Sequence, residues 1–127
     1  IRFVLIGWAL SRANFSKKVF LYLALASIVG TIFTLAYSYF FTGGVLKELH
    51  SVGHINHTAI FLVIAYSISV SMLLFDFKNR NLIQKIFLFM ASIILFSSTV
   101  DTDSRAAFGA LIIVTLINSI YFFWTCY

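Results

Sequence analysis

Long apolar runs separated by short polar segments dominate the hydrophobic pattern of this chain. Four runs lie at about residues 19–41, 58–75, 82–100 and 106–124, and a shorter apolar stretch covers about residues 1–10. A helix needs roughly 20 consecutive apolar residues, within a range of about 17–25, to cross the hydrocarbon core of a bilayer. The pattern therefore predicts an all-α fold, a polytopic transmembrane helix bundle with about four full spans plus a partial N-terminal one.

The third span is the least obvious of the four. Only 15 uncharged residues lie between Ile86 and Val100, which is short for a span. The run reaches 19 residues if the helix begins at Leu82, with Lys85 extending its charged end toward the interface. Because the chain begins at Ile1 inside an apolar stretch, we expect residues 1–127 to be a single transmembrane segment of a larger membrane protein.

Composition agrees with insertion in lipid and excludes two other classes of protein. Apolar residues make up 61% of the chain and charged residues 10%, whereas soluble domains have about 45–50% and about 25%. A soluble domain of this length could not bury so much apolar surface, because small domains bury the smallest fraction of their chain. The same apolar content excludes a disordered protein.

The charges divide unequally between the two sides of the predicted bundle. The loops at residues 11–18 and 76–85 together carry six basic residues and one acid, a net charge of +5, whereas the other side is balanced. Short cytoplasmic loops are enriched in Lys and Arg, so we expect these two loops in the cytoplasm and loops 42–57 and 101–105 in the periplasm. Topology thus accounts for the basic excess, and the expected partner is a lipid bilayer rather than nucleic acid.

Two pairs of small residues have the four-residue spacing that brings one face of a helix close to a neighbour. They are Ser67 with Ser71 and Ala106 with Ala110. Small side chains at this spacing let transmembrane helices approach closely. The pattern is weak, because such short pairs often arise by chance.

All three histidines lie in the first polar stretch on the balanced side, residues 42–58. His50 and His54 have the i, i+4 spacing of zinc ligands on helices. Gly53 lies between them, however, and no Glu or Cys completes a plausible ligand set, so we expect no metal site and no cofactor. The alternative for this stretch is a polar interfacial loop, with its histidines and Asn56 among headgroups and water.

The second polar stretch, residues 98–107, places Arg105 where a span begins. Free backbone N–H groups and the helix dipole favour an anion at that position, and the planar arginine fork matches phosphate oxygens. Ser104 is a suitable N-cap. In the alternative interpretation Arg105 only anchors the helix at the interface, or pairs with Asp101 or Asp103. These two aspartates also form an Asp-x-Asp pair that could hold Mg²⁺ or Mn²⁺, although two acids this close are common.

The two stretches together resemble elements of the O-antigen ligase/polymerase family of bacterial envelope proteins. The first element runs from Gly53 to Ala59 as GHINHTA and opens one span. Two helices later, and on the same side, the second element runs from Asp103 to Phe108 as DSRAAF and opens the next span. The family often has Gly where Ala106 stands here, which keeps that position small.

The resemblance implies an integral-membrane glycosyltransferase at the periplasmic face of the bacterial inner membrane. Such enzymes, which act in pathways such as lipopolysaccharide biosynthesis, transfer a glycan from an undecaprenyl-pyrophosphate carrier to lipid A-core, another repeat unit or a protein hydroxyl. It implies that Arg105 is the catalytic contact to the pyrophosphate, and that Ser104, Asn56 and His57 line the same substrate site. The family's catalytic histidine lies in a long periplasmic loop, which we expect beyond Tyr127.

Two other classes remain open at this point. A membrane transporter or flippase for a lipid-linked saccharide would also be polytopic, but transporters usually bind their substrate at the membrane midplane with broken helices and buried charge. Here the spans contain no proline and the charges stay near their ends. A structural or assembly subunit without chemistry would tolerate replacement of Arg105.

Overall fold

The computed structural model describes residues 16–41, 55–75 and 80–126, which contain four helices. They are α2 (Lys17–Phe41), α3 (Ile55–Phe75), α4 (Leu82–Val100) and α5 (Arg105–Cys126). Each is long and apolar enough to cross a membrane, and no strand occurs among the described residues. The predicted all-α, multi-span fold is confirmed, and the chain is a multi-pass membrane protein. The partial span predicted at residues 1–10 lies outside the described residues.

The helix bounds agree with the predicted spans, with one correction that affects the candidate site. Helix α4 has the predicted bounds, 82–100, including Lys85. Helix α3 begins at Ile55 rather than at residue 58, so Asn56 and His57 belong to its first turn and not to a loop. Helix α2 likewise begins two residues early, at Lys17. The reason is that a helix continues past the hydrocarbon core, where polar side chains reach headgroups and water.

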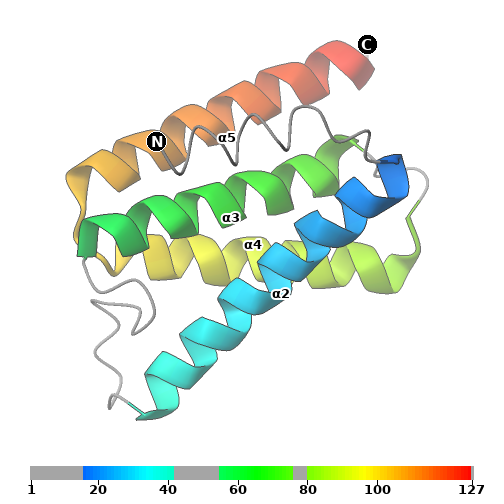
Figure 1. The fold of residues 1–127 in the computed structure, drawn as a ribbon. Coiled ribbons are helices and arrows are strands. Elements are labelled where there is room, and N and C mark those ends of the chain that lie inside the picture. Colours follow the sequence, from blue (N-terminus) through cyan, green and yellow to red (C-terminus); the bar gives the residue numbers. More distant parts are fainter. Residues whose placement is uncertain (1–15, 42–54, 76–79, 127) are drawn as a thin grey trace, which may run out of the picture.

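Helix α3 is the centre of the bundle. It packs most extensively on α4 and then on α5, while α2 crosses this group obliquely (Figure 1). Helices α3 and α5 begin at the same end of the bundle, beside the turn at residues 101–104 that joins α4 to α5; we name this the turn end. At the opposite end α2 and α4 begin, with four cations among the described residues; we name this the basic end. Those cations are Lys17, Lys18, Arg80 and Lys85.

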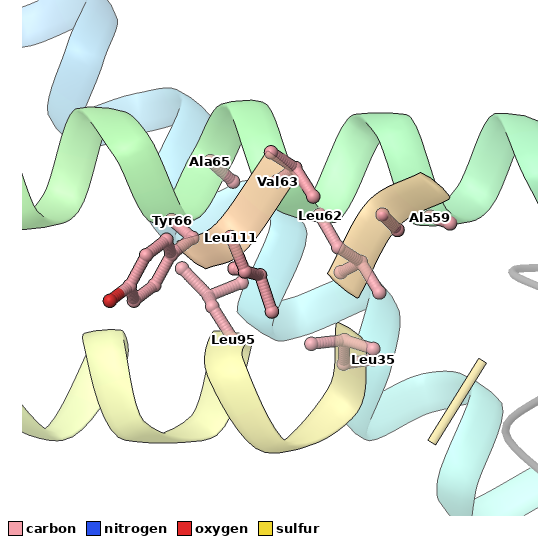
Figure 2. Close-up of a cluster of buried hydrophobic side chains, with 9 residues drawn as sticks. Leu35, Ala59, Leu62, Val63, Ala65, Tyr66, Leu95 and Leu111 are labelled. Atoms are coloured by element: carbon pink, nitrogen blue, oxygen red, sulfur yellow. The ribbon is translucent and has the colours of Figure 1, made fainter. Parts of the chain in front are cut away.

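A cluster of buried side chains joins all four helices (Figure 2). Leu35 of α2, Leu62 of α3, Leu95 of α4 and Leu111 of α5 are almost fully buried there. Because lipid tails are as apolar as leucine, the hydrophobic effect does not drive helices together inside a membrane. Close packing and hydrogen bonds between helices must therefore stabilise this arrangement.

Two hydrogen bonds link α3 to α5. The Tyr66 hydroxyl lies 2.9 Å from the Thr115 hydroxyl. Because the Thr115 hydroxyl donates to the Leu111 carbonyl oxygen at 2.7 Å, Tyr66 is the donor of this pair. One helical turn further along α3, the Ser71 hydroxyl donates to Oδ1 of Asn118 at 3.0 Å. Helix α3 is thus the donor in both bonds.

In the hydrogen bonds between α3 and α4, the donor again comes from α3. The Ser92 hydroxyl donates to the Leu88 carbonyl oxygen of its own helix at 2.8 Å. The Ser69 hydroxyl of α3 lies 3.0 Å from the Ser92 hydroxyl and 3.1 Å from the same carbonyl oxygen. With the Ser92 proton already donated, Ser69 supplies the proton between the helices. These bonds hold α3 in one register against both neighbours.

Candidate functional site

The α4–α5 turn, residues 101–104, is closed by its own hydrogen bonds. The Thr99 carbonyl oxygen accepts from the Thr102 N–H at 3.2 Å and from the Thr102 hydroxyl at 2.7 Å. The Asp103 N–H donates to the Val100 carbonyl oxygen at 3.1 Å. Thr102 is only 2% exposed, so its buried side chain stabilises the turn through the hydrogen bond to Thr99. This role for Thr102 was not predicted from the sequence.

Asp103 and Ser104 turn the chain into helix α5. Asp103 has a φ of 55°, in the left-handed region that aspartate enters more readily than most residues. The Ser104 hydroxyl then accepts from the Ala107 N–H at 3.4 Å, and its carbonyl oxygen accepts from the Phe108 N–H at 3.0 Å. The predicted N-cap at Ser104 is confirmed.

Arg105 is the first residue of α5 and is exposed. It lines a shallow hollow of about 270 Å³ at the turn end, together with Val100, Asp103, Ser104 and Phe108. The backbone N–H groups of Arg105 and Ala106 have no acceptor within the helix, because they belong to its first turn. The guanidinium and these N–H groups therefore lie at one helix start.

An apolar cleft of about 390 Å³ adjoins this hollow. Ile60, Val63 and Ile64 of α3 form one wall, and small residues of α5 form the other. These are Ala106, Ala107 and Ala110, with Ser104 at the end. Ser104 lines both this cleft and the hollow at Arg105, so both spaces border the start of α5. Ala107 is buried, Ala110 is partly buried and packs against the core cluster, and Ala106 is exposed. The predicted Ala106–Ala110 pair thus borders this cleft.

The start of α3 lies at the same end of the bundle. His57 is exposed, and Thr58 beside it is buried at 1% exposure. Asn56 is in the first turn of α3, but its side chain is not among those described. One helical turn further, Ile60 lines the apolar cleft opposite Ala106. The described part of the first predicted element and the whole of the second thus lie at the starts of neighbouring helices α3 and α5 (Figure 1). Residues of both helices line the cleft.

A metal ion in a protein is held by several ligands at once. Across residues 16–41, 55–75 and 80–126, no three His, Cys, Asp or Glu side chains lie close enough to hold a metal ion. Asp101 and Asp103 therefore gain no third ligand of this type from the described residues. His50 and His54 lie outside them, as do Lys47 and Glu48.

Comparison with protein-family models, with curated proteins and with solved structures gives no match for this chain. The O-antigen ligase/polymerase interpretation therefore depends on the two sequence elements and on the site they border. That site combines an exposed guanidinium, free N–H groups at a helix start and an adjoining apolar cleft. This combination suits an amphiphilic anion, with its negative group at Arg105 and its apolar part in the cleft.

Proposed function

We propose that the protein transfers a glycan from an undecaprenyl-pyrophosphate carrier to an acceptor hydroxyl. The supporting observation is that the Arg105 hollow and the apolar α3–α5 cleft both border Ser104 at the start of α5. A polyprenyl pyrophosphate has the matching chemistry, since it joins a doubly charged anion to a long hydrocarbon chain. Its pyrophosphate would lie at Arg105 and the first part of its chain between Ile60 and Ala106.

In this reaction the acceptor oxygen attacks the anomeric carbon of the carrier-linked sugar. The bond between that carbon and the phosphate oxygen breaks, and the carrier pyrophosphate leaves with the bonding electrons. Arg105 would bind the pyrophosphate through paired N–H donors and stabilise the charge that develops on the leaving oxygen, which is commonly the largest catalytic contribution. Ser104, Asn56 and His57 would line the substrate site. The acceptor proton needs a general base, which we expect from a part of the protein outside residues 1–127.

The two ends of the bundle support an orientation for this chemistry. The basic end holds Lys17, Lys18, Arg80 and Lys85, and such an end faces the cytoplasm by the positive-inside rule. The turn end would then face the periplasm of a bacterial inner membrane. Carrier-linked glycans are transferred on that face to lipid A-core, to another repeat unit or to a protein hydroxyl.

The test is replacement of Arg105 in the full-length gene, expressed in a strain that lacks the wild-type copy. We expect Arg105→Ala to abolish glycan transfer while the protein still inserts. Arg105→Lys should also transfer poorly, because an ammonium cannot reproduce the bidentate fork. Trp124→Ala is the control, since Trp124 is highly exposed near the other end of the same helix.

Gel electrophoresis of lipopolysaccharide and total surface glycan gives the result. Loss of long glycan with accumulation of unattached carrier-linked polymer would indicate a ligase, whereas single attached units would indicate a polymerase. An unchanged ladder from well-expressed Arg105→Ala protein would contradict the proposal. The transporter or flippase alternative would then be the one to test.

A further inference from the structure

A second groove lies along the seam between α3 and α4, away from the cleft at Ile60. One part, of about 280 Å³, extends from Ser97 and Phe96 to Leu73 and Phe89. The other part, of about 250 Å³, is lined by Leu73, Phe89 and Lys85, with Ile86 and Met90. Both parts border Leu73 and Phe89, so they follow one another along the seam, and we name them together the α3–α4 groove. It begins at the basic end and continues toward the turn end.

Two hydroxyl groups in the middle of the groove, those of Ser92 and Tyr66, are bonded within the protein. The Ser92 hydroxyl donates to the Leu88 carbonyl oxygen and accepts from Ser69. The Tyr66 hydroxyl donates to Thr115. With these groups satisfied, the groove offers mainly the aromatic and aliphatic surfaces of Phe89, Phe96 and their neighbours. An occupant therefore needs to be apolar along its length.

The length of the groove matches one leaflet of a bilayer. From Lys85 to Ser97 the helix rises about 18 Å, at about 1.5 Å per residue. Half of a hydrocarbon core of about 30 Å is about 15 Å. A lipid whose headgroup lies at the basic end would thus extend one acyl chain along most of the groove.

The positive charge at the basic end of the groove favours lipids with an anionic headgroup. Lys85 lines the mouth and is half-buried, and three more of the described cations, Lys17, Lys18 and Arg80, lie at this end of the bundle. Basic positions beside a transmembrane groove attract anionic lipid headgroups. We propose that the α3–α4 groove binds one anionic phospholipid from the leaflet at the basic end, with its phosphate at Lys85 and one acyl chain between α3 and α4. This site is separate from the proposed transfer site.

Lipid retention by the full-length protein tests the proposal. The protein is placed in nanodiscs of phosphatidylglycerol and phosphatidylcholine in equal amounts with the same acyl chains. After transfer to detergent, native mass spectrometry counts the lipids retained by each protein. We expect one phosphatidylglycerol to be retained in preference to phosphatidylcholine. Lys85→Gln should reduce that preference about fivefold, the effect of one basic residue near an anionic surface, whereas Lys18→Gln should change it less.

Blocking the groove separates this site from general lipid contact. Ile93 lines the groove and Ile94 does not, although both are exposed on α4. Ile93→Trp should abolish the retained phosphatidylglycerol, and Ile94→Trp should leave it in place. Equal retention of the two lipids by the wild type, or equal retention by the two tryptophan variants, would overturn the proposal. If Ile93→Trp fails to fold, Lys85→Gln decides, because unchanged preference in that variant also overturns it.

Discussion

The hydrogen bond between Ser71 and Asn118 gives a direct test of how α3 holds α5. Asn118 is only 6% exposed. Its Oδ1 accepts from Ser71 at 3.0 Å, and its Nδ2 donates to the Val114 carbonyl oxygen at 2.8 Å. Hydrogen bonds between transmembrane helices average about 0.6 kcal/mol, with a maximum of about 1.7 kcal/mol. We therefore expect a coupling energy of at least this size between the two side chains, because removal of Ser71 alone also leaves the buried Oδ1 of Asn118 without its donor.

The two single variants should differ in a definite direction. Ser71→Ala leaves Oδ1 of Asn118 buried without its donor, which carries a desolvation cost of about 1–3 kcal/mol in addition to the lost bond. Asn118→Leu leaves only the Ser71 hydroxyl, which can donate to a carbonyl oxygen of its own helix. Ser71→Ala should therefore lower the free energy of unfolding more than Asn118→Leu does. The double variant should be nearly as stable as Asn118→Leu alone.

The assay is unfolding of the full-length protein in mixed micelles as the fraction of dodecyl sulfate rises. Thr34→Ala serves as a control, because the exposed Thr34 hydroxyl donates to the Gly30 carbonyl oxygen of its own helix. Its free energy of unfolding should stay within about 0.5 kcal/mol of the wild type. A coupling energy of zero between Ser71 and Asn118, or a greater loss for Asn118→Leu than for Ser71→Ala, would refute the reasoning.

Three further predictions concern the core, the turn and metal removal. Leu111→Ala should destabilise the protein by about 2–5 kcal/mol in the same assay, because Leu111 is fully buried, whereas Ile113→Ala, at a position 58% exposed, should cost far less. Asp103→Val should lower stability by about 1–2 kcal/mol relative to Asp103→Gly, because a β-branched residue is strained at a φ of 55°. EDTA should leave glycan transfer unchanged; its loss, with recovery on adding Mg²⁺ or Mn²⁺, would indicate a metal held by Asp101 and Asp103.

The four spans could be predicted from the sequence because bilayer thickness fixes the length of each apolar run. The start of α3 was harder to predict from the sequence. Asn56 and His57 have the composition of a loop, yet they lie in a helical turn, since the first turn of a membrane helix can extend into the headgroup region. The Ser104 cap depended only on local sequence, and that prediction was correct.

Features that depend on how two helices pack together could not be predicted from the sequence. Asn118 is a single polar residue in an apolar run, and only the packing of α5 on α3 reveals its partner Ser71. The spacing of Ala106 and Ala110 is visible in the sequence, but whether it brings a helix close or leaves a cleft depends on the rotation of α5. Here all three alanines, Ala106, Ala107 and Ala110, border the cleft, and Ala107 is also buried in the core cluster.

The short α4–α5 turn determines the route by which any ligand reaches Arg105. Helix α4 has 19 residues and is therefore about 28 Å long, close to the roughly 30 Å of a hydrocarbon core. A turn that spans only residues 101–104 cannot lift Arg105 far above the end of that helix. In a bilayer spanned by α4, the guanidinium would therefore lie near the depth of the lipid phosphates, at the start of a helix that borders the apolar cleft. A ligand would enter sideways by diffusion within the leaflet, and its supply would depend on its surface density in the membrane rather than on a concentration in water.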